Sequence, residues 1–115
     1  MAKGTGGNVT VHIAFDRFPE LMREYPRRAS EIVRTSAYEI EARAKVAAPV
    51  DTGNLYNSIH TEMGQDGMSA VVGTSVEYAI YQEYGTYKMA AHPYMRPAAD
   101  AVRPSFIKAV EDALK

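Results

Sequence analysis

The sequence contains no cysteine and no tryptophan among its 115 residues. Without cysteine the chain can form no disulfide and offers no thiolate for chemistry. The formal net charge is −1, so no overall electrostatic attraction draws the protein to nucleic acid or to an anionic membrane. No apolar run approaches the length of a membrane-spanning helix, and the first residues, MAKGTGGN, lack the apolar stretch of a secretory signal. Nothing here argues for export, and the missing cysteines suit a cytosolic protein as well as many others.

What the chain does contain is typical of one globular domain. Hydrophobic residues make up 46% and charged residues 23% of the sequence, which is an ordinary balance for a folded protein. The small, glycine-rich residues 1–8 predict a flexible N-terminal arm, and residues 9–115 predict a single domain large enough for a core without disulfides. The GTGG of the arm is not a phosphate-binding loop, because no Lys-Ser or Lys-Thr pair follows at the required spacing.

The first half of the domain has the periodicity of a strand followed by two helices. Apolar residues alternate with others over residues 9–15, which predicts a half-buried strand. Residues 18–25 fit a short helix, and Pro26 fits the first turn of a longer helix that extends to Ala48. An apolar stripe runs along this longer helix, and its other face carries glutamate–cation pairs at i and i+4. The pairs are Glu24–Arg28, Glu39–Arg43 and Glu41–Lys45.

A β-hairpin is predicted after the long helix. Residues 58–63 and 68–74 are strand candidates, and the Gly-Gln-Asp-Gly linker between them suits a tight turn. In this alternation Ile59 faces the core, while His60 and Glu62 lie together on the opposite face.

The C-terminal part predicts a short helix over residues 76–84 that ends at Gly85, followed by an exposed loop. Pro97 can start a final helix, which Pro104 should kink or restart. The expected fold is therefore of the α+β class, with a small antiparallel sheet packed against one long helix and a C-terminal helix.

The stretch AAPVDTGNLYNSIH, residues 47–60, links the long helix to the β region. Pro49 ends a helix because it removes a backbone donor and crowds the preceding turn. Asp51 can cap the next turn, Gly53 permits a close backbone approach, and Leu55 can fasten the turn to the core. We expect a corner of the fold here. Its determinants are Pro49, Asp51, Thr52, Gly53, Leu55 and Ser58.

The triplet Asp51-Thr52-Gly53 also permits an enzymatic interpretation. Aspartic proteases of the dimeric viral type use Asp-Thr-Gly, with two such aspartates sharing one proton across a dimer. Those proteases are all-β, whereas a long helix leads into this triplet. In addition, Pro49 stands where a strand should deliver the aspartate, and Asn54 replaces the usual small residue. A helix cap with a turn glycine explains the triplet better.

A metal site would draw on the three histidines and on nearby carboxylates. These residues are His12, His60, His92, Glu62, Glu77 and Glu83. No two of the histidines have the i,i+3 or i,i+4 spacing that makes such a site persuasive. The sequence contains neither a cysteine nor a G-x-S-x-G elbow that could provide a catalytic nucleophile. We therefore expect no catalytic residue, no metal and no cofactor.

Tyrosine is concentrated near the predicted loop. Tyrosine combines a large contact area with a polar tip, which favours protein interfaces, although two or three of these rings could instead cap the sheet. We predict a protein–protein assembly surface formed by the loop and the helix before it. Its residues are Tyr81, Tyr84, Thr86, Tyr87, Lys88, Met89, His92, Tyr94 and Arg96. Single-stranded nucleic acid could stack on the same rings, but only Lys88 and Arg96 add local positive charge.

Three segments of the sequence are similar to a known family in their residues, their order and their spacing. They are APVDTGNLYNSI, VGTSVEYAIYQEYGT and KMAAHPYMRPA. Together they resemble the gene-product-ten-like tail-component family of siphophages, which are small head–tail joining or tail-completion proteins of tailed phages and prophages. The resemblance covers residues 26–115. The matching positions are Asp51, Thr52, Gly53, Leu55, Ser58, Ile59, Val72, Gly73, Thr74, Tyr78, Ala79, Tyr81, Glu83, Gly85, Thr86, Pro93, Arg96, Pro97 and Ala98.

The chain departs from the usual family residues at four positions. They are Tyr56, Ile80, Ala90 and His92, where arginine, proline, proline and glutamine are common. These departures put particular contacts in doubt, chiefly a charge pair at Tyr56, but not the membership.

The resemblance implies a non-enzymatic structural protein of virion assembly. Several copies would form a closed, heterologous ring at the head–tail junction, although the free protein could stay monomeric. The implied partners are the connector, the tail tube or a terminator, with no membrane and no sequence-specific nucleic acid. The implied location is the virion tail or neck, and the host cytoplasm during assembly. Two alternatives stay open, namely a dimeric aspartic protease and a generic adaptor domain that binds a cellular protein.

Overall fold

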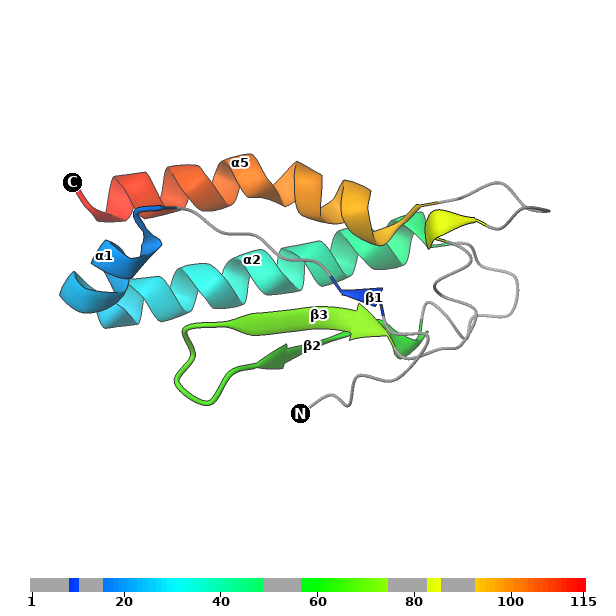
Figure 1. Ribbon diagram of the computed structural model, residues 1–115, viewed down its shortest axis with the longest axis horizontal. Helices are drawn as coiled ribbons and strands as arrows, with labels where there is room; N and C mark the ends of the chain where they lie inside the picture. The colour runs from blue at the N-terminus through cyan, green and yellow to red at the C-terminus, as the bar shows by residue number, and fades with distance from the viewer. Residues whose placement is uncertain (1–8, 11–15, 49–56, 75–82, 86–92) are drawn as a thin grey trace.

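The computed structural model describes residues 9–10, 16–48, 57–74, 83–85 and 93–115. Two long helices lie side by side, and a small antiparallel sheet packs beneath the longer of them (Figure 1). In chain order the elements are β1 (Val9–Thr10), α1 (Phe18–Glu24), α2 (Pro26–Ala47), β2 (His60–Met63), β3 (Ala70–Thr74) and α5 (Met95–Ala113). The predicted α+β class, with a sheet against one long helix and a C-terminal helix, is confirmed.

The long helix α2 begins at Pro26, whose fixed φ and missing N–H suit the first helical position. Its buried stripe consists mostly of small residues, which let α5 and the sheet approach closely. The buried residues are Ala29, Val33, Ala37, Ile40 and Ala44. Two predicted ion pairs are present on the polar side. Arg43 Nε lies 3.0 Å from Glu39 Oε2, and Lys45 Nζ lies 3.3 Å from Glu41 Oε2.

Arg28 departs from its predicted pairing with Glu24. Its Nη1 donates instead to the carbonyl oxygen of Ala113 at 2.8 Å, and its guanidinium lies 4.4 Å from the centre of the Tyr25 ring. Cations are favourable partners for the unpaired carbonyls at the C-terminal end of a helix. Arg28 therefore joins the start of α2 to the end of α5, which a rule based on local spacing cannot anticipate.

The three strands are ordered β1-β3-β2, and both pairings are antiparallel. The predicted hairpin is confirmed: β2 and β3 pair from His60 opposite Gly73 to Met63 opposite Ala70. Gly67 in the connecting turn has a φ of 75°, and a Cβ there would lie 2.5 Å from Ser30 Oγ on α2. A glycine is required at this position both for the backbone angle and for the close packing of the turn on the helix.

The C-terminal helix α5 begins at Met95, two residues before Pro97, and runs without a restart past Pro104 to Ala113. A proline inside a helix removes the hydrogen bond to the carbonyl four residues earlier, here that of Asp100. Both residues are exposed, so water can bind the carbonyl that the proline leaves unpaired. The predicted stripe Ala98, Val102, Phe106 and Val110 is buried as expected.

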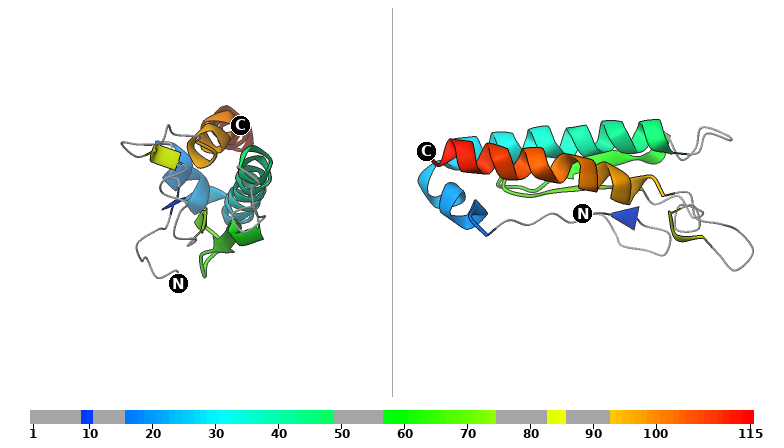
Figure 2. Two further views of the ribbon diagram at one scale, coloured as in Figure 1. Left: turned by 90° about the vertical axis from the view of Figure 1, so that its right-hand side faces the viewer. Right: turned by 90° about the horizontal axis from the view of Figure 1, so that it is seen from above.

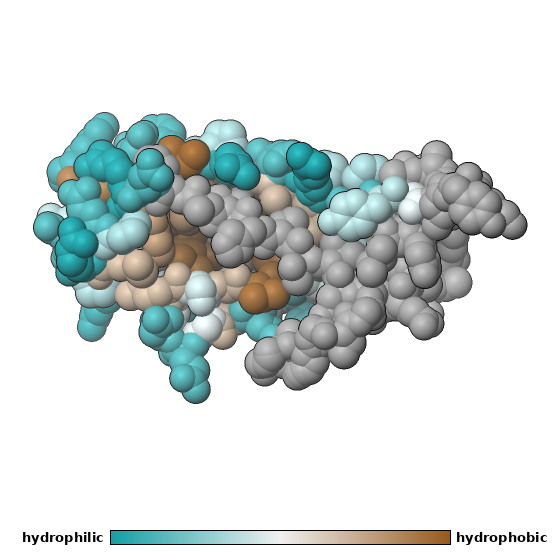
Figure 3. Space-filling view, in the orientation of Figure 1, coloured by the Kyte–Doolittle hydropathy of each residue, from teal (hydrophilic) through white to brown (hydrophobic). Residues whose placement is uncertain are grey.

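The core consists of two clusters along the helix pair. One joins α2 and α5 to the sheet through residues such as Ile40, Ile59 and Val102. The other joins α1 to the far end of α5 through Leu21, and here the rings of Phe18 and Phe106 lie 5.7 Å apart. The end-on view in Figure 2 shows the helices and the sheet surrounding this common interior, and Figure 3 shows apolar residues gathered in the middle of one face.

The docking of α1 on the second cluster generates a stability prediction. Leu21 is fully buried, so Leu21→Ala should remove packing on both α2 and α5 and lower the free energy of unfolding by about 2–5 kcal/mol. Urea denaturation followed by circular dichroism measures this change. The control is Val46→Ala on exposed α2 surface, which should change stability by less than about 0.5 kcal/mol. Equal effects of the two substitutions would contradict the packing of α1 described above.

Candidate assembly surface

The start of α5 is held by the carboxylate of Glu83, a residue that lies before the predicted loop. Glu83 Oε1 accepts the backbone N–H groups of Tyr94 at 3.0 Å and Met95 at 2.8 Å. Glu83 Oε2 accepts the N–H of Arg96 at 3.0 Å. Glu83 is 4% exposed, so one buried carboxylate binds three backbone donors. A negative charge at this end of a helix is also favoured by the helix dipole.

This arrangement accounts for all the donors that a helix leaves unpaired at its start. The first four N–H groups of a helix have no partner within it. At α5 three of them, from Tyr94 to Arg96, bind Glu83, and the fourth position is Pro97, which has no N–H. Tyr94 occupies the N-cap position and makes no capping hydrogen bond with its own side chain. Glu83 therefore replaces a local cap from a position 11 residues earlier in the chain.

Residues 83–85 end in the predicted helix-terminating glycine. Gly85 has a φ of 77°, the left-handed conformation expected after a helix end. Residues 83–84 have helical conformation, and the rest of the predicted helix, 75–82, lies outside the described residues. Two of the sequence segments that carry the family resemblance thus meet in space, because the Glu83 side chain binds the backbone of the third segment.

The predicted assembly surface is described at three of its nine residues. Tyr84 is 68% exposed, and the Arg96 side chain is 82% exposed with its Nε 4.0 Å from Asp100 Oδ2. Both can contact another molecule. Tyr94 is 0% exposed and packs in the core cluster between α2 and α5, so its ring does not line the surface of the single chain. The other six residues, Tyr81, Thr86, Tyr87, Lys88, Met89 and His92, lie outside the described residues.

The predicted corner after α2 is described only at its edges. α2 ends at Ala47, directly before the segment that contains Pro49, and Ala48 is buried in extended conformation. On the other side Ser58 Oγ and Thr74 Oγ1 are hydrogen-bonded, which ties the chain after the corner to β3. The remaining corner residues Pro49, Asp51, Thr52, Gly53 and Leu55 lie outside the described residues, and so does the protease triplet.

The outer face of β2 carries a small ionic cluster. His60 Nδ1 lies 2.9 Å from the Ser58 carbonyl oxygen, and His60 Nε2 lies 3.3 Å from Glu62 Oε2. The hydrogen bond to the Ser58 carbonyl raises the pKa of His60, partial burial opposes this, and Glu62 adds to the rise. Because their side chains are in contact, His60 and Glu62 share the outer face of β2, as the alternation of the sequence predicted. On the inner face Thr61 Oγ1 donates to Glu41 Oε1 of α2 at 2.7 Å.

Metal-binding chemistry finds no support in the part of the chain that the structure describes. No group of three or more histidines and carboxylates gathers there. Glu83, one of the candidate ligands, is occupied by backbone donors. His12, Glu77 and His92 lie outside the described residues. Of the helices described, none is long and apolar enough to cross a bilayer.

Comparison with known proteins gives one finding. The model of a family described as "Bacteriophage HK97-gp10, putative tail-component" matches residues 16–85, which is more than half of the chain. The matched segment includes α1, α2, β2 and β3 and ends just after Glu83. It confirms the family resemblance drawn from the sequence segments. No curated protein and no solved structure matches the chain.

The capping of α5 generates a second prediction. Glu83→Gln keeps one acceptor oxygen but turns an amide N–H₂ towards backbone donors, so the free energy of unfolding should fall by about 1–3 kcal/mol. Thermal or urea denaturation measures the loss. Glu111→Gln on exposed α5 surface makes the same chemical change without a capping role and should leave stability nearly unchanged. A similar result for the two variants would show that the cap contributes nothing.

The raised pKa of His60 generates a third prediction. A group whose pKa is higher in the folded state stabilises the fold when it is protonated, below its unfolded pKa, and that contribution is lost as pH rises through the folded pKa. The stability difference between the wild type and His60→Gln should therefore be larger near pH 5 than near pH 8. Urea denaturation across this range tests it, and a difference that grows with pH would contradict the assignment.

Proposed function

We propose that this chain, which belongs to the HK97-gp10-like family of bacteriophage tail components, acts as a structural protein of the head–tail junction. The match over residues 16–85 is the observation that carries the proposal. In this role the protein is not an enzyme, and it works by binding other phage proteins. Its partners are the tail tube on one side and the connector or terminator on the other, and it resides in the virion after assembly in the host cytoplasm.

The proposed mode of assembly is a ring of identical copies. A junction between the tail tube and the connector surrounds a rotation axis. In a ring around such an axis, two different patches on each copy meet the patches of its two neighbours. The residues in and beside the predicted loop supply one patch in this proposal. Exposed Tyr84 and Arg96 support it, because tyrosine and arginine are the residue types that contribute most at protein interfaces. The near-neutral charge also suits protein partners better than nucleic acid.

The Glu83 cap gives the proposed patch a rigid base. Tyr84 follows the capping residue directly, and Arg96 is one of the residues whose N–H groups are capped. The hydrogen bonds therefore fix the backbone from which both exposed side chains extend. A surface whose backbone is already ordered loses less conformational entropy when it binds. We include in the proposal that residues 1–8 order against a neighbouring copy on assembly, and that the ring forms only on a template.

The prediction for this function separates the proposed patch from the core. Tyr84→Ala combined with Arg96→Ala should leave the free energy of unfolding within about 0.5 kcal/mol of the wild type, because both side chains are exposed. Joining of tail tubes to filled heads should fall at least about tenfold, as expected when interface tyrosine and arginine side chains are truncated. The assay adds purified variant to extracts that lack this protein and counts joined particles by electron microscopy.

The control for this prediction is Tyr94→Ala, a substitution of the same residue type in the core. It should lower the free energy of unfolding by about 3–5 kcal/mol. Normal joining by a stable Tyr84→Ala, Arg96→Ala protein would remove these residues from the assembly surface. Normal particles from extracts that contain no copy of the protein would remove the junction role altogether.

A further inference from the structure

The strand β2 is at the edge of the sheet, since the strand order is β1-β3-β2. In an antiparallel pair, residues that bond to the partner strand alternate with residues whose N–H and C=O groups point away from it. Gly64 N–H donates to the Ser69 carbonyl oxygen at 2.8 Å in the same register as the hairpin. Counting back from this pair, Glu62 and His60 bond to β3. The backbone groups of Thr61 and Met63 therefore point outward, and no described strand pairs with them.

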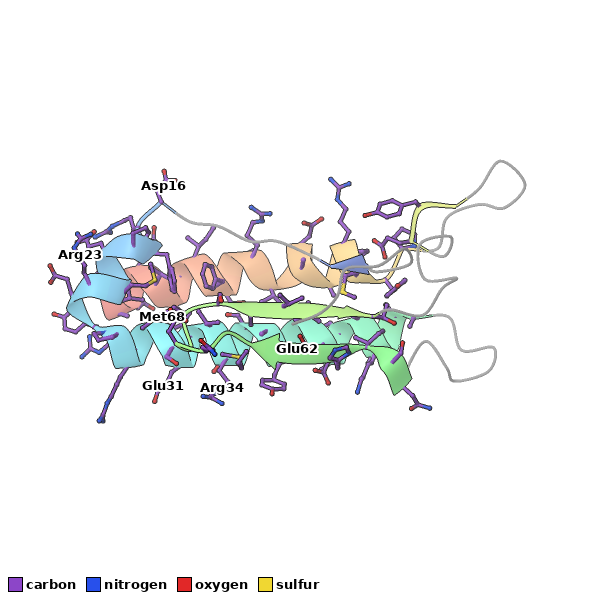
Figure 4. All side chains as sticks on the ribbon, turned by 60° about the horizontal axis from the view of Figure 1, so that its bottom comes forward. Asp16, Arg23, Glu31, Arg34, Glu62 and Met68 are labelled. Carbon is purple, nitrogen blue, oxygen red and sulfur yellow. The ribbon has the colours of Figure 1, made fainter. Side chains whose placement is uncertain are left out.

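This open edge is held rigidly against the long helix. The Thr61 hydroxyl donates to Glu41, and Lys45 binds the same carboxylate from the next turn of α2. Tyr38 lies one turn before Glu41 on this face of α2 and is 48% exposed, although it is a large aromatic residue. Figure 4 shows β2, which carries the labelled Glu62, lying along α2, and these two elements are in contact. An ordered edge strand beside an exposed aromatic ring is a template for another strand.

The charges on β2 select which strand can pair with it. On the outer face His60 and Glu62 have opposite charge when the histidine is protonated. A second β2 in antiparallel orientation, with Thr61 opposite Thr61, places each His60 directly opposite the Glu62 of the other copy. These are non-hydrogen-bonded pairs, in which side chains lie closest. A shift by two residues in either direction instead sets Glu62 against Glu62, or His60 against His60, and like charges directly opposite are unfavourable.

We propose that β2 pairs with the β2 of a second copy of this chain, in the register centred on Thr61. Thr61 of each copy exchanges two backbone hydrogen bonds with the other, and His60 of each copy lies opposite Glu62 of the other on both sides of this pair. The two sheets become one continuous sheet across a twofold axis. The inference goes beyond the junction role, because a twofold pair closes on itself and cannot extend into a ring. It is a state of the free protein, and it uses neither Tyr84 nor Arg96.

Two charge variants test the pairing between chains. Glu62→Lys sets histidine opposite lysine in a homodimer, and His60→Glu sets two carboxylates opposite each other. We expect each variant alone, near pH 6, to raise the dimer dissociation constant at least about tenfold, because two favourable pairs become repulsive. Analytical ultracentrifugation over a concentration series measures it, and circular dichroism checks that each variant is folded. Glu111→Lys, the same charge reversal on exposed α5 surface, should dimerise as the wild type does.

Mixing the two variants is the decisive step. In a mixed dimer one cross-strand pair is histidine with glutamate and the other is lysine with glutamate, so both are attractive. Native mass spectrometry should therefore show heterodimers at concentrations where neither variant dimerises alone. Within each variant chain, the side chains at positions 60 and 62 still have like charges after mixing. Relief of repulsion within a chain therefore cannot explain the formation of heterodimers.

Three results would overturn the proposal. They are a wild type that stays monomeric at every concentration, a dimer that neither charge variant weakens, and a mixture that shows no preference for heterodimers. Joining of tails to heads is scored separately, so a failed junction role and a failed strand pairing give different results.

Discussion

The placement of α5 depends on the hydrogen bonds between the Glu83 carboxylate and the first backbone N–H groups of this helix. Burying a carboxylate is unfavourable unless its oxygens are bonded, and three backbone N–H groups provide those bonds. The same bonds remove the penalty of leaving helix donors unpaired. Because α5 supplies buried residues to both core clusters, an interaction that fixes where it begins also fixes how it packs on α2 and α1. One side chain thus fixes the end of α5 from which the helix packs on the rest of the core.

The features that could be predicted from the sequence are those set by local chemistry. The period of apolar residues, a proline at a helix start and a glycine turn between strands depend only on neighbouring residues, and they gave α1, α2 and the hairpin. Contacts between distant segments could not be predicted in this way. Nothing local distinguishes Tyr84, which is exposed, from Tyr94, which is buried. The sequence indicates Glu83 only as a motif position and as a possible metal ligand, because its capping partners lie 11 to 13 residues later.

The shape of the chain separates its possible contact regions. The molecule measures 49 × 26 × 21 Å, with α2 and α5 along its length. One end holds α1 and the C-terminus, and residues 83–85 and the start of α5 lie towards the other (Figure 1). Small residues in the buried stripe of α2 permit close packing along the rod, which favours a rigid body over a hinged one. A rigid rod can bind a partner at one end without rearranging the other end, which suits the proposed joint between two assemblies.

An open strand edge on such a rod needs control, because unpaired edges also bind unintended strands. β2 limits this by being four residues long and by carrying a histidine and a glutamate on its outer face. The charges of His60 and Glu62 disfavour pairing with an unrelated strand, but they are complementary to a second β2 in one antiparallel register. The same two residues therefore provide both the pairing and its specificity. The bond from Thr61 to Glu41 adds to this control, since it holds the edge in place on α2 and prevents the strand from shifting its register. An edge with these properties is suited to a short-lived pair that a stronger interface can replace.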